Sequence, residues 1–198
     1  MKVTVIRLGV GNTASVKFAL ERLGAAVRLT DDPLEISEAE RLILPGVGAA
    51  AFAMHRMDAI GVRDAIVNFK RPLLGICLGQ QLLFEESEEG AVETLGLIGG
   101  MVRRLPASIA APAPHMGWSR LSAVKPDPLL EGVREGDYCY FVHSFACPVN
   151  EATLAVSSYS GAFAAAIGMR NIYGCQFHPE RSGEPGRRIL SNFLALPC

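Results

Sequence analysis

A single cysteine stands between two glycines in the stretch GICLGQQLLF, residues 75–84. An apolar run precedes Cys77 and a run with helical spacing follows it, so the cysteine falls at a strand-to-helix turn. A nucleophile in such a turn needs small residues two positions before and after it, where the strand and the helix approach closely. Gly75 and Gly79 provide this spacing. The pattern indicates a nucleophilic thiol; the alternative is a buried cysteine whose glycine neighbours serve packing alone.

The same turn suggests how the reaction is stabilised. It sets the sulfur at the positive end of a helix predicted over residues 78–86, where a thiolate is favoured over the thiol. It also directs the amide of Leu78 toward an oxygen on the attacked carbon. A second amide donor is expected from Gly46, Val47 or Gly48 in LILPGVGA, because glycine lets backbone approach a ligand closely. This loop alone could equally be a plain turn.

A nucleophilic thiol usually needs a base, and His178 in the stretch YGCQFHPE is the first candidate. Pro179 pushes His178 into an extended conformation, in which residues two apart face the same side. Glu180 can therefore reach the imidazole and hold its tautomer. Alternatively, the tripeptide is an exposed strand end with a chance carboxylate. His115 and His143, in polar and aromatic surroundings, remain open as bases.

The elements that must position these residues follow an α/β pattern in the first half of the chain. Strands are expected at 3–8, 27–30, 42–44 and 73–76, and helices at 12–24, in two stretches of 49–70, and at 78–86. This alternation predicts an open, mostly parallel sheet flanked by helices. The ligand crevice of such a sheet lies outside the carboxyl ends of its strands, and Cys77 sits at one of them.

The second half has a different pattern, which predicts an antiparallel extension of the sheet. Strand-like segments with short turns between them cover residues 118–124, 137–145, 153–159, 162–169 and 172–177, and a closing helix is expected at 184–196. No repeat or linker divides the chain, so its 198 residues predict one domain spanning 1–198.

Bulk composition excludes several classes of protein. The net charge of −1, with charges of both signs interspersed, argues against nucleic-acid binding. No apolar run reaches the ~18–20 residues of a membrane span, and the first residues do not form an export signal, so we expect a cytoplasmic protein. Five cysteines without a CxxC pair predict neither a disulfide framework nor a structural metal site.

Three motifs together resemble the class I (triad) glutamine amidotransferases: PGVG at 45–48, GICLGQQ at 75–81 and QFHPE at 176–180. The resemblance implies that Cys77 is the nucleophile, that His178 is first the base and then the acid, and that Glu180 orients the imidazole. It implies an oxyanion hole made by Leu78 and the loop 46–48. It implies no cofactor and no metal.

The substrate implied by the resemblance is L-glutamine. Gln81 would help to hold it, and backbone around His143, Ser144 and Phe145 would receive its α-carboxylate and amine. The activity implied is hydrolysis to glutamate and ammonia through a cysteine thioester.

Three further stretches resemble a subgroup of free-standing glutaminase subunits in histidine biosynthesis: PHMGWS at 114–119, YFVHSF at 140–145 and GVGNTASV at 9–16. For these the resemblance implies a heterodimer with a separate cyclase subunit, which receives the ammonia. Asn12, Met116 and Trp118 would then face the partner. The chain departs from the subgroup at three places: Gln80 stands where Met is frequent, Ser119 where Asn is usual, and Arg7-Leu8 where Asp-Tyr is common.

Three rival interpretations remain. A glutaminase of another synthase, such as anthranilate synthase, would carry the same triad, and a non-catalytic regulatory subunit would keep the fold without using it. An NAD-binding oxidoreductase is suggested by the amino terminus. There, a strand precedes Gly9-x-Gly11-x-x-Ala14 and a helix, and Asp31 and Asp32 follow about 20 residues later. That template accounts for none of the later motifs.

Overall fold

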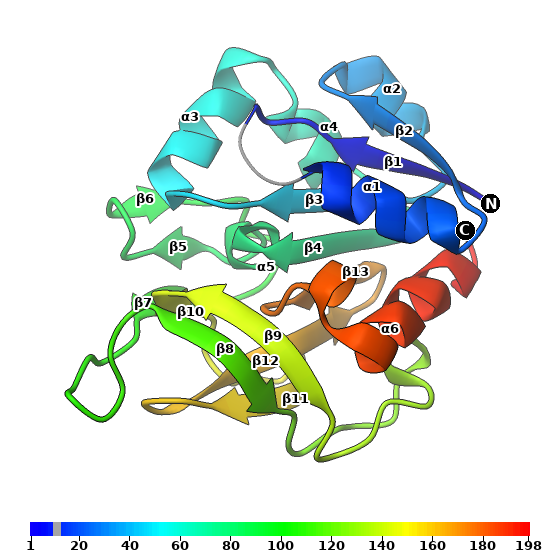
Figure 1. The fold of residues 1–198 in the computed structure, drawn as a ribbon. Coiled ribbons are helices and arrows are strands. Elements are labelled where there is room, and N and C mark those ends of the chain that lie inside the picture. Colours follow the sequence, from blue (N-terminus) through cyan, green and yellow to red (C-terminus); the bar gives the residue numbers. More distant parts are fainter. Residues whose placement is uncertain (10–12) are drawn as a thin grey trace.

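A seven-stranded sheet forms the centre of the computed structural model, which describes residues 1–9 and 13–198 (Figure 1). In spatial order its strands are β11 (Thr153–Ser158), β12 (Ala162–Met169), β13 (Ile172–Cys175), β4 (Leu73–Cys77), β3 (Leu42–Gly46), β1 (Lys2–Ile6) and β2 (Ala26–Thr30). The strands from β2 to β13 are parallel, whereas β12 and β11 run antiparallel. The predicted parallel sheet with an antiparallel extension is confirmed.

Helices cover both faces of the parallel strands. On one face lie α1 (Thr13–Arg22) and α6 (Gly183–Ala195); on the other lie α2 (Pro33–Glu38), α3 (Ala50–Ala59), α4 (Arg63–Val67) and α5 (Leu78–Leu82). The strands supply both cores because side chains alternate: in β3, Ile43 packs with the α1 and α6 side, and Leu42 and Leu44 with the other. No helix in the described residues is long and apolar enough to cross a membrane.

The helix predicted over residues 78–86 is wrong in length, because α5 ends at Leu82. Backbone amides of a later segment take the carbonyls that a longer helix would use. Leu95 donates to the carbonyl of Leu82 and Leu97 to that of Leu83, each at 2.9 Å. Stabilisation of a thiolate at Cys77 by the positive end of this helix stays a prediction.

Two smaller sheets lie outside the central one. The hairpin of β8 (His115–Arg120) and β9 (Tyr138–His143) is separate, so the prediction that these strands extend the main sheet is wrong. A four-stranded sheet orders β10 (Phe145–Ala146), β7 (Met101–Arg104), β5 (Glu86–Ser87) and β6 (Val92–Glu93).

The prediction that residues 172–177 belong to the antiparallel extension holds for one edge of the strand and is wrong for the other. One edge of β13 pairs antiparallel with β12, but its other edge pairs parallel with β4. This strand thus joins the extension to the parallel sheet and brings the stretch that follows it to the end of β4. The described part of the chain also contains two short 3₁₀ turns, η1 (Pro128–Leu130) and η2 (Pro179–Arg181).

Candidate active site

The turn at Cys77 is a strained one. Cys77 ends β4 and immediately precedes α5, with φ of 55° and ψ of −111°, a region that residues with side chains rarely adopt. A Cβ on Gly79 would lie 1.7 Å from the carbonyl oxygen of Leu44, and one on Gly75 would lie 2.6 Å from the carbonyl oxygen of Gly79. The close approach of strand and helix therefore requires glycine at both positions, as the spacing predicted.

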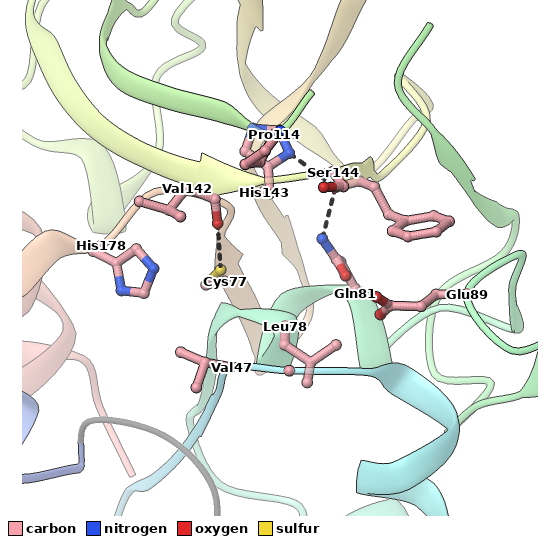
Figure 2. A pocket seen from close by; sticks show the side chains of 12 residues that line it. Val47, Cys77, Leu78, Gln81, Glu89, Pro114, Val142, His143, Ser144 and His178 are labelled. Atoms are coloured by element: carbon pink, nitrogen blue, oxygen red, sulfur yellow. Dashed lines mark hydrogen bonds between the residues drawn. The ribbon is translucent and has the colours of Figure 1, made fainter. Parts of the chain in front are cut away.

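A cavity of about 240 Å³ opens at this turn (Figure 2). Its walls are formed by Val47, Gly48, Cys77, Leu78, Gln81, Glu89, Pro114, Val142, His143, Ser144, Phe145 and His178. Most of these residues were predicted from the sequence, although they come from separate parts of the chain. The carboxyl ends of β3 and β4 supply one side, and the end of β9 supplies the other.

The sulfur of Cys77 faces the end of β9. Its Sγ lies 3.6 Å from the carbonyl oxygen of Val142, the contact of a neutral thiol, and 3.9 Å from Nε2 of Gln176. In Figure 2 the ring of His178 stands beside this sulfur, on the same wall of the cavity. Transfer of the thiol proton to His178 would break the contact with Val142 and leave a thiolate in the cavity.

His178 and Glu180 form the pair that the sequence predicted. The Nδ1 of His178 lies 2.9 Å from Oε1 of Glu180, and the two side chains are only 13% and 2% exposed. A carboxylate accepts the Nδ1 proton, which leaves Nε2 of the ring as the nitrogen available to the cavity. The backbone amide of His178 also donates to the carbonyl of Tyr140 at 2.9 Å, which ties this stretch to β9.

The surroundings favour the protonated form of His178. Burial lowers the pKa of the imidazole, but hydrogen bonds and negative charge from Cys77 and Glu180 outweigh the burial and raise that pKa to about 10. The site therefore favours an imidazolium at His178 at neutral pH. An imidazolium in this place can give a proton to a leaving group.

The other two candidate bases are engaged elsewhere. Nδ1 of His143 lies 2.8 Å from the carbonyl oxygen of Phe145, and its Nε2 lies 3.0 Å from Nδ1 of His115. Burial lowers the pKa of His115 and of His143 to about 4 each. Neither nitrogen of His143 is free to take a proton from Cys77, so the geometry favours His178 as the base.

The residues predicted to form the oxyanion hole border two separate spaces. Leu78, Val47 and Gly48 line the cavity, and Gly48 has a φ of 97° that favours glycine. Gly46 instead lies in β3 in register with Cys77 and borders a separate space of about 10 Å³ with His178 and Glu180. Of the predicted donors, those that line the cavity together with Cys77 are thus Leu78 and the two positions after Gly46.

The opposite end of the cavity carries hydrogen-bond acceptors. Gln81 uses its amide nitrogen for the carbonyl of Phe145 at 2.8 Å and for Oε1 of Gln176 at 3.0 Å, so its own Oε1 remains to accept. Glu89 adds a carboxylate, whose Oε2 also accepts from the amide of Ala50 at 2.9 Å. Glu89 was not predicted from the sequence, because nothing distinguishes it within an acidic run that begins at Glu85.

Two of the predicted partner-facing residues are exposed. Met116 and Trp118 on β8 are 64% and 54% exposed, while His115 on the same strand points inward and is buried. Asn12, the third, lies outside the described residues, and so does Gly11 of the dinucleotide template. The carboxylates of that template are occupied: Asp31 pairs with Arg7 at 3.0 Å, and Asp32 accepts from the first turn of α2.

Comparison with known proteins gives one consistent result. The family model for glutamine amidotransferase class-I matches residues 4–196. The imidazole glycerol phosphate synthase subunit HisH of Haemophilus influenzae is 47% identical over 194 residues, which are 98% of this chain and 97% of that one. The subunit of the same name from Xylella fastidiosa is 48% identical and covers 98% of each chain.

Solved structures are similar in fold at lower identity. A structure described as glutamine amidotransferase is matched with a TM-score of 0.74 at 20% identity over 98% of this chain and 99% of that one. PurLQS from Thermotoga maritima is matched with a TM-score of 0.71, also at 20% identity, over 98% of this chain and 97% of that one. These likenesses concern the fold alone.

Proposed function

Because this chain belongs to the class I glutamine amidotransferases, we propose that it is the glutaminase subunit of an imidazole glycerol phosphate synthase, with residues 1–198 as one catalytic domain. The observation that carries the chemistry is the cavity at the end of β4, where Cys77 meets the pair of His178 and Glu180. The relatives at 47–48% identity support the choice of synthase.

In the first half of the reaction, the Cys77 thiolate attacks the side-chain amide carbon of glutamine. The carbonyl oxygen becomes an oxyanion, which the amide of Leu78 and an amide of the loop after Gly46 stabilise. The imidazolium of His178 then protonates the departing nitrogen. Ammonia leaves, and a γ-glutamyl thioester remains on the sulfur.

In the second half, water hydrolyses the thioester. His178, now neutral, takes a proton from the water through Nε2, and the hydroxide attacks the thioester carbon. A second oxyanion forms in the same place and collapses to release glutamate and the Cys77 thiolate. Glu180 keeps the Nδ1 proton throughout, so it orients the ring and stabilises its charge without being protonated itself.

The far end of the cavity fits the amino-acid part of the substrate. A free α-ammonium is a donor with three protons, and the Oε1 of Gln81 and the carboxylate of Glu89 are both acceptors. Backbone of Ser144 and Phe145 lies on the same wall and would meet the α-carboxylate. This polarity would fix the direction in which glutamine enters and place its side-chain amide at Cys77.

The ammonia needs a second protein. In water at neutral pH, ammonia is protonated and lost as a nucleophile, so a glutaminase that feeds a synthesis must pass it directly to the next site. We assign that role to a separate cyclase subunit in a heterodimer, docked over the face that carries Met116 and Trp118. Such a pair of biosynthetic enzymes would work in the cytoplasm.

Glutamine hydrolysis with and without the cyclase and its ligand tests this proposal. We expect little glutamate release from the isolated chain and a large increase in the liganded complex, with synthase product formed from glutamine as efficiently as from added ammonia. Absence of glutamate release in the liganded complex would refute the function, and equal turnover without the cyclase would refute activation by a partner. A synthase of another pathway, such as anthranilate synthase, should give no response.

A further inference from the structure

Two buried histidines link the substrate cavity to strand β8 through an unbroken chain of hydrogen bonds. Nδ1 of His143 lies 2.8 Å from the carbonyl oxygen of Phe145. Nε2 of His143 lies 3.0 Å from Nδ1 of His115, and Nε2 of His115 lies 2.9 Å from the hydroxyl oxygen of Ser119. Two pairs of near neighbours in sequence, 28 positions apart at His115 and His143, are therefore joined in one line. The proposed catalytic steps use neither imidazole.

The direction of every proton in this chain follows from its last member. A carbonyl oxygen can only accept, so the Nδ1 of His143 must carry a proton. The Nε2 of a neutral His143 then accepts, which requires a proton on Nδ1 of His115. In turn, Nε2 of His115 accepts, and Ser119 must donate its hydroxyl proton. Both rings are thus fixed as the neutral form with the proton on Nδ1.

The surroundings keep both rings neutral, as this arrangement needs. His115 and His143 are 2% and 6% exposed. Burial lowers the pKa of His115 to about 4. The pKa of His143 is also about 4: burial lowers it, the hydrogen bond to Phe145 raises it, and the neighbouring imidazoles of His115 and His178 disfavour a second positive charge. An added proton on Nε2 of His143 would put two donors face to face, whereas one on Nε2 of His115 would turn the hydroxyl of Ser119 from donor into acceptor.

The carbonyl at the end of the chain belongs to the wall that we assign to the substrate. Phe145 accepts from both His143 and Gln81, each at 2.8 Å. The preceding carbonyl, that of Ser144, accepts from the amide of Leu105 at 2.8 Å. Both carbonyls of the segment 144–145 therefore accept hydrogen bonds that fix its position. One of the donors, Gln81, also lines the cavity proposed for the substrate.

We infer that His115 and His143 are positioning residues for glutamine. Their chain of directed hydrogen bonds holds the carbonyl of Phe145, and with it Gln81 and the backbone of Ser144, in the orientation that receives the amino-acid end of the substrate. This inference rests on the proposed glutaminase function. It gives the hydroxyl of Ser119 a role as the donor that completes the chain.

The competing explanation is that His115 merely fills space. Its ring stacks on Tyr159 at a centroid distance of 4.2 Å and on Phe141 at 5.1 Å, so a flat apolar ring would pack there too. Two substitutions separate the explanations, because each explanation expects a different one of them to impair glutamine binding more. His115→Phe keeps the flat ring and removes both hydrogen bonds, whereas His115→Gln loses the ring and retains one donor and one acceptor.

In the complex with the cyclase, we expect His115→Phe to raise KM for glutamine by about tenfold or more with little change in kcat, because it weakens binding and leaves the chemistry intact. His115→Gln should keep KM within about threefold of the wild type. The reverse order, or unchanged KM in both variants, would overturn the inference. His55→Phe, on the exposed side of α3, is the matched control, and thermal unfolding of each variant reports any loss of packing.

Nitrogen chemical shifts of the histidine rings give a readout that needs no turnover. The wild-type chain at pH 7 should show a protonated Nδ1 and an unprotonated Nε2 for both His115 and His143. A proton on Nε2 of His143, or a doubly protonated ring, would refute the inferred direction of these hydrogen bonds. A wild-type complex that hydrolyses no glutamine would refute the proposed function and the positioning role with it, while these tautomers would still report whether the chain of hydrogen bonds exists.

Discussion

The reactivity of the site depends on which nitrogen of His178 faces the sulfur. Oε1 of Glu180 lies 2.9 Å from Nδ1 of His178 and accepts its proton, so Nε2 is the nitrogen that can exchange a proton with the sulfur or the substrate. The raised pKa of His178, about 10, has a consequence for stability. Its charged interactions stabilise the folded chain fully below the pKa of the unfolded state, about 6.5, and this contribution is lost as the pH rises through about 10.

Glu180→Gln removes the negative charge but preserves the size of the side chain. We expect kcat for glutamine hydrolysis to fall by about 10² or more, because the imidazolium loses its counter-charge and the ring loses its fixed tautomer. The pKa of His178 should fall as well, since the hydrogen bond and charge of Glu180 raise it. Steady-state kinetics and an NMR titration of His178 measure the two effects.

Glu184→Gln is the control for this change. Glu184 is exposed and pairs with Arg187 and Arg188 on α6, away from the cavity. Its substitution should alter neither kcat nor the pKa of His178. Wild-type kcat in Glu180→Gln would remove that carboxylate from the mechanism.

At the scale of elements, the site depends on how closely β3, β4 and α5 approach one another. The backbone of Gly79 touches that of Leu44, with no room for a methyl group between them. This contact fixes where α5 begins and therefore where the amide of Leu78 points. The strained conformation of Cys77 persists because the buried elements on both sides of it hold the chain in place.

Gly79→Ala should be one of the most destabilising small substitutions in the chain. A Cβ placed 1.7 Å from a backbone oxygen forces strand and helix apart, and overpacking of this kind costs about 1–3 kcal/mol or more in the free energy of unfolding. Urea unfolding compared with Gly161→Ala measures it, because a Cβ at Gly161 meets nothing within 4 Å. Equal unfolding midpoints for the two variants would show that the close contact does not exist.

Helices and strands in which apolar residues recur with a clear period were predicted correctly from the sequence. The buried strands and the long helices α1 and α6 lie within a few residues of their predicted ranges. The turn at Cys77 and its partner stretch at His178 were also predictable, because glycine and proline restrict the backbone locally. Local patterns of this kind are sufficient to identify the three residues of the triad as candidates.

What the sequence did not predict depends on long-range contacts. Strands β5 and β6 are two residues long and show no period. Helix α5 stops at Leu82 because amides of residues 95–98 take the carbonyls of residues 82–84. Glu89 reaches the cavity through its contact with Ala50, 39 positions away. The pairing of His115 with His143 arises only because β8 and β9 place them opposite each other.

At the scale of the whole molecule, the cavity lies where three parts of the chain meet: the ends of the parallel strands, the hairpin β8–β9 and the small sheet that contains β10. Strand β8 presents Met116 and Trp118 outward and His115 inward. A partner bound on this strand would therefore rest on residues adjacent to those that orient the substrate. This arrangement is suited to a glutaminase whose activity depends on assembly.

The rate of glutamate release by the liganded complex with Cys77→Ala tests the central claim most directly. We predict that the rate falls by about 10⁴-fold or more, because no other group in the cavity can form the thioester. Cys198→Ala, at an exposed cysteine outside the cavity, should retain the wild-type rate. Glutamate release from Cys77→Ala at a rate near that of Cys198→Ala would contradict the account.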